Sequence, residues 1–296
     1  MAQTNGSEDV TFRSGVSNVR IDAQVTQDNE LVVGLTAQDF VVQDEGKPQP
    51  ITYFGRESEP LSLILLLDVS GSMKQYIQQV ASVARQSLSY LRPGDRVAVM
   101  AFARNSKVRQ EFTDDMSSVT SEIRDAVNDE SLGSGTAVND AVTAAAGYIE
   151  AHGGERGRRA VLIITDNLGL NYKNPDESVL SALGQSNAVL NALVVGKGTK
   201  PPSPMPPGVY TNPDFTPFNV FHLSDQSGGE AVRAEKASAA FPNMIERIRT
   251  RYSLHYNKPP SAGSGYRNVE VTLAPAARLK YPRAVIRARK GYMAKA

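Results

Sequence analysis

Five oxygen-bearing side chains lie directly after predicted strands or directly before a predicted helix. From these positions they could bind one cation together. They are Asp68, Ser70, Ser72, Thr136 and Asp166. Carboxylate and hydroxyl oxygens are the ligands that hard divalent cations prefer, and the set contains neither histidine nor thiolate. The residue types therefore predict a site for Mg²⁺, with Mn²⁺ or Ca²⁺ as alternatives, and argue against zinc.

The spacing of these residues supports a shared site. In a loop that leaves a strand, alternate residues such as 68, 70 and 72 can turn toward one ion, while Val69 packs and Gly71 allows the bend. Two carboxylates that converge without a cation repel each other and are costly to bury. Five protein ligands leave a sixth octahedral position for water or an incoming carboxylate. Asp140, one turn after Thr136, either orients the metal loop or caps and packs its helix.

The elements that must position this set alternate between strand and helix patterns. Continuous apolar runs at 61–68 and 158–166 read as strands covered on both faces, and segments with helical spacing of apolar residues separate the strand patterns. Such alternation predicts a doubly wound α/β domain with a mostly parallel sheet over 60–250. The carboxyl ends of its strands meet at one edge, which would bring the five side chains together. Within this region, 218–234 is predicted as strand, turn and strand.

Three further segments lack this alternation of strand and helix patterns. Short alternating strands are predicted in 10–58 and again in 251–293, where the last runs over 279–292. Each segment alone has too small a core, so we expect the two to pair into one β-sandwich that carries the α/β domain. The proline-rich segment 197–217 is predicted as a long surface loop, which either is a passive insertion or contacts a partner.

Composition narrows the function classes. The chain has 296 residues with 41% hydrophobic content, and its 32 basic residues almost balance its 31 acidic ones. That balance gives no support for nucleic-acid binding, and the absence of cysteine excludes thiol catalysis and disulfides. The sequence has no apolar run near the length of a membrane-spanning helix.

The motif order DxSxS, then GT before a helix, then an apolar strand ending in TD, resembles the von Willebrand factor type A (VWA) domain. Asp68, Ser70, Ser72, Thr136 and Asp166 match the metal-ion-dependent adhesion site (MIDAS) of that family. The resemblance implies that the three hydroxyls contact the metal directly or nearly so and that the two aspartates often act through water. It also implies a protein partner that supplies a glutamate or aspartate as the last ligand. The sequence after the second aspartate, TDNLGLN, departs from the glycine that is common there in the family.

The flanks resemble a narrower group, the VWFA-related proteins abundant in Acidobacteria, through LTAQDFVVQDEGKPQPITYF, RYSLHYNKPP and VIRARKGY. Because members of the group typically carry secretion signals, we expect an extracytoplasmic protein, periplasmic, secreted or on the cell surface, with its signal peptide removed. A cytoplasmic location stays open, since the polar N-terminus has no apolar signal region. Neither the partner nor the oligomeric state follows from the sequence.

Three functional hypotheses are compatible with these residues. The first is a non-enzymatic module that recognises a partner carboxylate through its divalent cation. The second is a structural extracytoplasmic assembly component in which the metal site is vestigial or stabilising. The third is Mg²⁺-dependent phosphoryl transfer with Asp68 as nucleophile. It is the weakest, because such phosphatases need a second acid two residues later, where this chain has Ser70.

Overall fold

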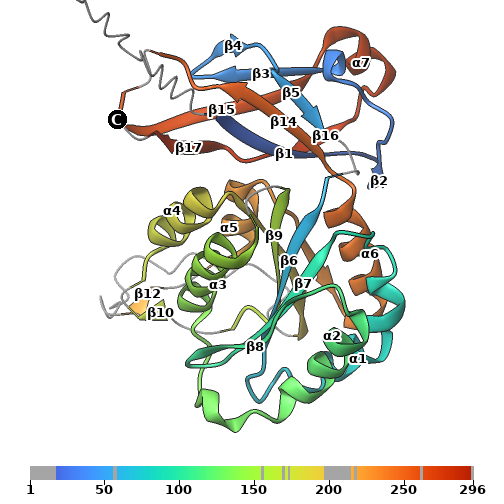
Figure 1. Cartoon of the computed structure of the whole chain (residues 1–296), viewed down its shortest axis with the longest axis vertical. Coiled ribbons are helices and arrows are strands. Elements are labelled where there is room, and N and C mark those ends of the chain that lie inside the picture. Colours follow the sequence, from blue (N-terminus) through green and yellow to red (C-terminus); the bar gives the residue numbers. More distant parts are fainter. Residues whose placement is uncertain are drawn as a thin grey trace, which may run out of the picture.

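The protein is described here by a computed structural model, in which an α/β domain and a β-sandwich lie one above the other (Figure 1). The structure describes residues 18–55, 59–154, 157–168, 171–172, 174–196, 215–216, 219–260 and 263–294. Most of the proline-rich segment predicted as a surface loop lies outside these ranges. None of the helices within these ranges is long and apolar enough to span a membrane.

The α/β domain is built on a sheet whose six described strands have the order β13-β11-β9-β6-β7-β8. All neighbours pair in parallel except β8, which runs antiparallel to β7. The strands are β6 (Leu61–Asp68), β7 (Arg96–Phe102), β8 (Ser106–Thr113), β9 (Arg158–Thr165), β11 (Ala188–Val195) and β13 (Ala231–Ala234). Every residue of β6 is buried, as expected for a central strand covered on both faces.

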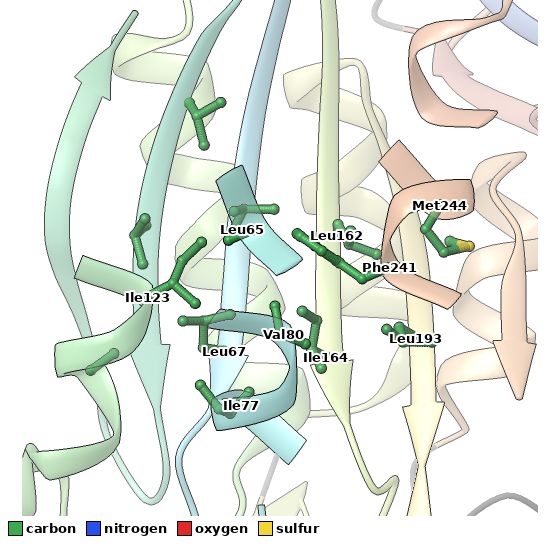
Figure 2. Close-up of a cluster of buried hydrophobic side chains, with 14 of the residues drawn as sticks. Leu65, Leu67, Ile77, Val80, Ile123, Leu162, Ile164, Leu193, Phe241 and Met244 are labelled. Atoms are coloured by element: carbon green, nitrogen blue, oxygen red, sulfur yellow. The ribbon is translucent and has the colours of Figure 1, made fainter. Parts of the chain in front are cut away.

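Helices cover both faces of this sheet. They are α1 (Lys74–Leu88), α2 (Met116–Asp125), α3 (Val138–His152), α4 (Asp176–Ser186), α5 (Val220–Ser227) and α6 (Ala237–Arg249). Leu65 and Leu67 of β6 share a buried cluster with α1, α2 and α6, whereas Leu66 shares a second cluster with α3, α4 and α5. Figure 2 shows the first cluster, in which Phe241 of α6 lies beside Leu162 of β9. Each fully buried aliphatic side chain there stabilises the fold by roughly 1.5–3 kcal/mol.

The β-sandwich contains two antiparallel sheets, and each combines strands from both ends of the chain. The first has the order β16-β1-β14-β5, with β2 also on β1, and the second has the order β17-β15-β3-β4. Their strands are β1 (Asn18–Gln27), β2 (Glu30–Leu31), β3 (Phe40–Asp44), β4 (Lys47–Gln49), β5 (Tyr53–Gly55), β14 (Tyr252–Asn257), β15 (Gly265–Leu273), β16 (Val285–Arg287) and β17 (Gly291–Ala294).

One apolar cluster joins the two sheets, because Ile21 and Leu254 of the first pack with Val42 and Val271 of the second. Fully buried Asp44 also links the chain ends, since it accepts hydrogen bonds from Tyr256 and Tyr292 and forms an ion pair of 2.6 Å with Arg267. The predicted fold class, a mostly parallel α/β sheet with additional antiparallel sheets, is confirmed.

Three details of the sequence prediction were wrong. Residues 220–227, which fall in the first strand and the turn of the segment predicted as strand, turn and strand, form helix α5. The Asn219 side chain caps its first turn by accepting from the amides of residues 221 and 222, and Gly228 ends it in the left-handed conformation. Helix α7 (Pro275–Lys280), which starts with proline, takes the beginning of the last predicted strand. The edge strand β8, which is antiparallel to β7, was not predicted at all, because polar residues interrupt its sequence and leave no continuous apolar run.

Two arginines lie at the amino-terminal ends of the parallel strands, where the α/β domain meets the sandwich. Arg158, at the start of β9, is 2% exposed and donates to the carbonyls of residues 248 and 249 at the end of α6. Arg20 of β1 donates to the carbonyl of Gly157 and pairs with Glu59 at 2.6 Å. The sandwich therefore contacts the edge of the sheet opposite to the one where the strand ends carry Asp68 and Asp166.

Candidate metal centre

The loop between β6 and α1 carries the first three predicted ligands. Asp68, the last residue of β6, is fully buried, and both its carboxylate oxygens accept hydrogen bonds. Its Oδ1 accepts from the backbone N–H of Ser70 at 3.0 Å, and its Oδ2 accepts from Oγ1 of Thr165 at 2.7 Å. Ser70 is half-buried and Ser72 is exposed, so their hydroxyl groups lie between the buried carboxylate and solvent.

Asp166, directly after β9, is joined to the same loop. It is 3% exposed, and its Oδ2 accepts a hydrogen bond from Oγ of Ser72 at 2.7 Å. Its Oδ1 accepts from the backbone N–H of Leu168 at 3.0 Å. The Ser70 and Ser72 hydroxyl oxygens are 3.4 Å apart. The structure thus brings together Asp68, Ser70, Ser72 and Asp166, which come from two neighbouring central strands.

Electrostatics around the two aspartates are unfavourable without a cation. The pKa of Asp68 is raised from 3.8 to about 6; burial is the main cause, the hydrogen bonds from Ser70 and Thr165 oppose the shift, and the charge of Asp166 adds to it. Among the described residues, no lysine or arginine forms an ion pair with either aspartate. A divalent cation would supply the missing positive charge.

The hydroxyl of Ser72 is oriented in a way that suits a metal. A serine hydroxyl has one proton and two lone pairs, and here the proton goes to Asp166. One lone pair can accept from the Ser70 hydroxyl, 3.4 Å away, and the other stays available for a cation. Within the described ranges, no group of three or more His, Cys, Asp or Glu side chains could hold a metal ion. A cation at this edge would therefore depend on hydroxyl ligands as much as on carboxylates, which fits Mg²⁺ better than a soft metal.

Thr136, the fifth predicted ligand, lies in the loop before α3. No hydrogen bond within the described ranges joins its side chain to the other four residues. Its loop is anchored by the backbone N–H of Ala137, which donates to the carbonyl of Ala103 after β7 at 2.8 Å. Because Asp68 and Phe102 pair in adjacent strands, this anchor holds the Thr136 loop to the same edge of the sheet.

The two predicted supporting residues have roles that differ in part from the expectation. Asp140 is exposed in the first turn of α3, and its Oδ1 accepts a hydrogen bond from the Asn174 side chain at 2.8 Å. This bond ties α3 to the segment before α4. Gly71 is exposed and has no left-handed φ, and a Cβ added there would meet nothing within 4 Å. The bend after Asp68 therefore does not require glycine for its backbone conformation.

Sequence reasoning missed two residues that shape the site. The Thr165 hydroxyl donates to Asp68 and accepts from the backbone N–H of Asn167, so it connects both metal-site loops. Asn167 has a left-handed φ of 55° and stands where glycine is common in the resembling family. Its Oδ1 accepts from the backbone N–H of Val220, which links the Asp166 loop to the start of α5. The only signals in the sequence were a hydroxyl before Asp166 and an asparagine after it.

Comparison with known proteins agrees with this geometry. Residues 63–169 match the family model of the von Willebrand factor type A domain, so the chain contains a VWA domain. No curated protein gives a significant match. Two similar solved structures show the same fold at low identity.

One is BatB from Bacteroides thetaiotaomicron, a conserved hypothetical protein that is 20% identical, with a TM-score of 0.50 over 64% of this chain and 97% of that chain. The other is proximal thread matrix protein 1 from the mussel byssus, with a zinc-occupied MIDAS motif. It is 16% identical, with a TM-score of 0.50 over 70% of this chain and 50% of that chain. At these identities the likeness concerns the fold.

Proposed function

We propose that this protein is a non-enzymatic binding module that recognises a protein partner through a divalent cation, most favourably Mg²⁺, held at the carboxyl edge of its central sheet. The ligands are Asp68, Ser70, Ser72, Thr136 and Asp166. A glutamate or aspartate of the partner completes the coordination. The observation that carries the proposal is the hydrogen-bonded group of two buried aspartates and two serines, which form no ion pair with a lysine or arginine in the described part of the chain. The zinc-occupied MIDAS of the mussel protein supports divalent-cation binding by this fold.

The exposure of the site supports a carboxylate partner. Ser72 is exposed and Leu168, beside Asp166, is an apolar side chain with 47% exposure. A cation bound between the hydroxyls would thus face solvent on one side, with an apolar contact next to it. A partner glutamate or aspartate would supply an oxygen for the open coordination position of the ion, and Leu168 would contact the neighbouring part of the partner.

We also propose the limits and setting of this module. The metal-binding VWA domain spans 60–250, and the flanks 10–58 and 251–293 form the sandwich that carries it. An extracytoplasmic location suits a module that binds other proteins by adhesion. A structural assembly role with a stabilising metal is the second candidate, because the hydrogen bonds at the site also join the loops after β6 and β9.

Calorimetric titration of metal-stripped protein with Mg²⁺, Mn²⁺ and Ca²⁺, with and without acetate as a partner mimic, tests the binding proposal. We expect one ion per chain, tighter binding in acetate, and loss of both effects in Asp68→Ala and Thr136→Ala. Asp114→Ala, which removes an exposed carboxylate outside the cluster, is the matched control. Absence of ion binding in both conditions would refute the proposal. Ion binding that acetate leaves unchanged would favour the structural role.

A further inference from the structure

A second site is suggested by a cavity of about 330 Å³ at the junction of the two domains. It lies between α4 and the start of β11 on one side and strands β1, β15 and β17 of the sandwich on the other. The amino-terminal end of β11 contributes Ala188 and Val189, whereas the candidate metal centre lies beyond the carboxyl ends of the strands. The cavity therefore belongs to neither the metal centre nor its partner surface.

Most of the wall is apolar. Leu180 and Leu183 of α4 and Val189 of β11 line it from the VWA domain, and Tyr292 lines it from β17. Tyr266 and Met293, which pair across β15 and β17, also line the cavity and are 55% and 50% exposed. The volume is at the small end of the roughly 300–1,000 Å³ typical of small-molecule sites.

The two arginines of the wall differ in their partners. Arg20 is neutralised, because it forms ion pairs with Asp22 and Glu59. Arg289 has no acidic partner within the described residues, and its guanidinium donates only to neutral oxygens, those of Gly184, Asn187, Arg20 and Gly291. Burial lowers its pKa, and the attraction of Asp22 opposes the shift. Glu177, the other carboxylate of the wall, is exposed at the start of α4.

We propose that this cavity binds a small carboxylic acid with an apolar body, with its carboxylate on Arg289 and its body against Leu180, Tyr266 and Met293. Four of the five N–H groups of Arg289 already donate to neutral oxygens, so the side chain offers a carboxylate the remaining Nη2–H together with its positive charge. Arg289 is the cation of the wall that forms no ion pair among the described residues, so it favours a ligand with one negative charge. The predominantly apolar wall disfavours a phosphate or a dicarboxylate, whose further charges would lose their hydration without a partner.

The test uses the full chain and two monoacid probes, phenylacetate and octanoate, with phenylacetamide as the uncharged match. Binding is followed by ¹³C-methyl NMR of the methionines, because Met293 lies at the cavity and is assigned by Met293→Leu. We expect saturable shifts of the Met293 signal with at least one acid and much weaker ones with the amide. Arg289→Gln should weaken acid binding about 10- to 100-fold, as expected for a lost hydrogen bond to a charged group.

A second variant keeps the test independent of any structural effect of Arg289. Ser181 lines the cavity on α4, so Ser181→Phe should fill it and abolish binding, whereas Ser178→Phe, on the exposed side of the same helix, should leave binding unchanged. Binding should also persist in Asp68→Ala without metal, which separates this proposal from the metal-dependent one. No saturable binding of either acid, equal binding of acid and amide, or unchanged binding in Ser181→Phe would each overturn the proposal.

Discussion

Replacing Asp68 by asparagine should stabilise the metal-free protein, although it destroys the proposed cation site. The carboxylate is fully buried, and burial raises its pKa from 3.8 to about 6. The folded state therefore holds the ionised form less well than the unfolded chain does. Each pKa unit corresponds to about 1.4 kcal/mol, so ionised Asp68 destabilises the metal-free fold by about 3 kcal/mol above pH 6.

The sign follows from proton binding. Between the two pKa values the folded state binds more protons than the unfolded state, so this contribution to stability is lost as the pH rises from 3.8 to about 6. The same relation leaves a penalty of about 1 kcal/mol near pH 4.5 and about 3 kcal/mol near pH 7.5. Asparagine is always neutral, but its amide cannot accept both hydrogen bonds of Asp68, which costs about 1 kcal/mol.

We therefore expect Asp68→Asn to be about 2 kcal/mol more stable than the unmodified protein near pH 7.5 in EDTA. The assay is urea unfolding followed by circular dichroism. The difference should fall by about 2 kcal/mol near pH 4.5. Excess Mg²⁺ should stabilise the unmodified protein and leave Asp68→Asn unchanged, because only the former binds the ion.

Asp114→Asn controls for the loss of an exposed carboxylate and should behave like the unmodified protein at both pH values. A lower stability of Asp68→Asn in EDTA near neutral pH, or a difference that does not depend on pH, would refute the reasoning. The first result would mean that the hydrogen bonds of Asp68 outweigh the cost of burying its charge.

Four other outcomes are expected from urea unfolding. Phe241→Ala removes a fully buried ring from the cluster in Figure 2 and should cost about 3–5 kcal/mol, whereas a cost below about 1 kcal/mol would contradict the packing. Asp44→Asn leaves Arg267 without its buried partner and should cost about 3 kcal/mol, so full stability would exclude a central role in the sandwich. Asn219→Ala removes the cap of α5 and should cost about 1 kcal/mol, with restoration by Asn219→Asp. Burial lowers the pKa of His255 below 6.5, so its contribution to the free energy of unfolding is complete above pH 6.5 and is lost as the pH falls through the folded-state pKa. A histidine NMR titration should show the lowered pKa. Urea unfolding of His255→Gln should show a weaker dependence of stability on pH.

Much of the α/β domain was predictable, because its strands are both buried and continuous. The run 61–68 has no polar residue before Asp68 except Ser62, and a segment of this kind is stable only between two helical layers. From that, the meeting of Asp68 and Asp166 at one edge follows by topology alone. The ligand set of the proposed site could thus be chosen without coordinates.

The details that escaped prediction depend on contacts between distant segments. Apolar residues at 218, 220, 221 and 223 fit a strand as well as a helix, and the cap of Asn219 together with the left-handed Gly228 decides for the helix. The left-handed Asn167 and its bond to Val220 exist only once α5 lies beside the Asp166 loop. Likewise, Arg158 carries no sequence signal for its buried position, because arginine is normally exposed.

The pairing of β1 with β14 has a consequence for biosynthesis. Asn18 pairs with Asn257, which leaves the ribosome 239 residues later, or roughly 10–50 s at about 5–20 residues per second. During that interval β1 has emerged without β14 and β16, and β3 without β15, while the VWA domain between them and the C-terminus is completed. The nascent chain thus exposes unpaired strand edges for the whole synthesis of the inserted domain, and its yield should depend on protection of those edges more than on the stability of the finished fold.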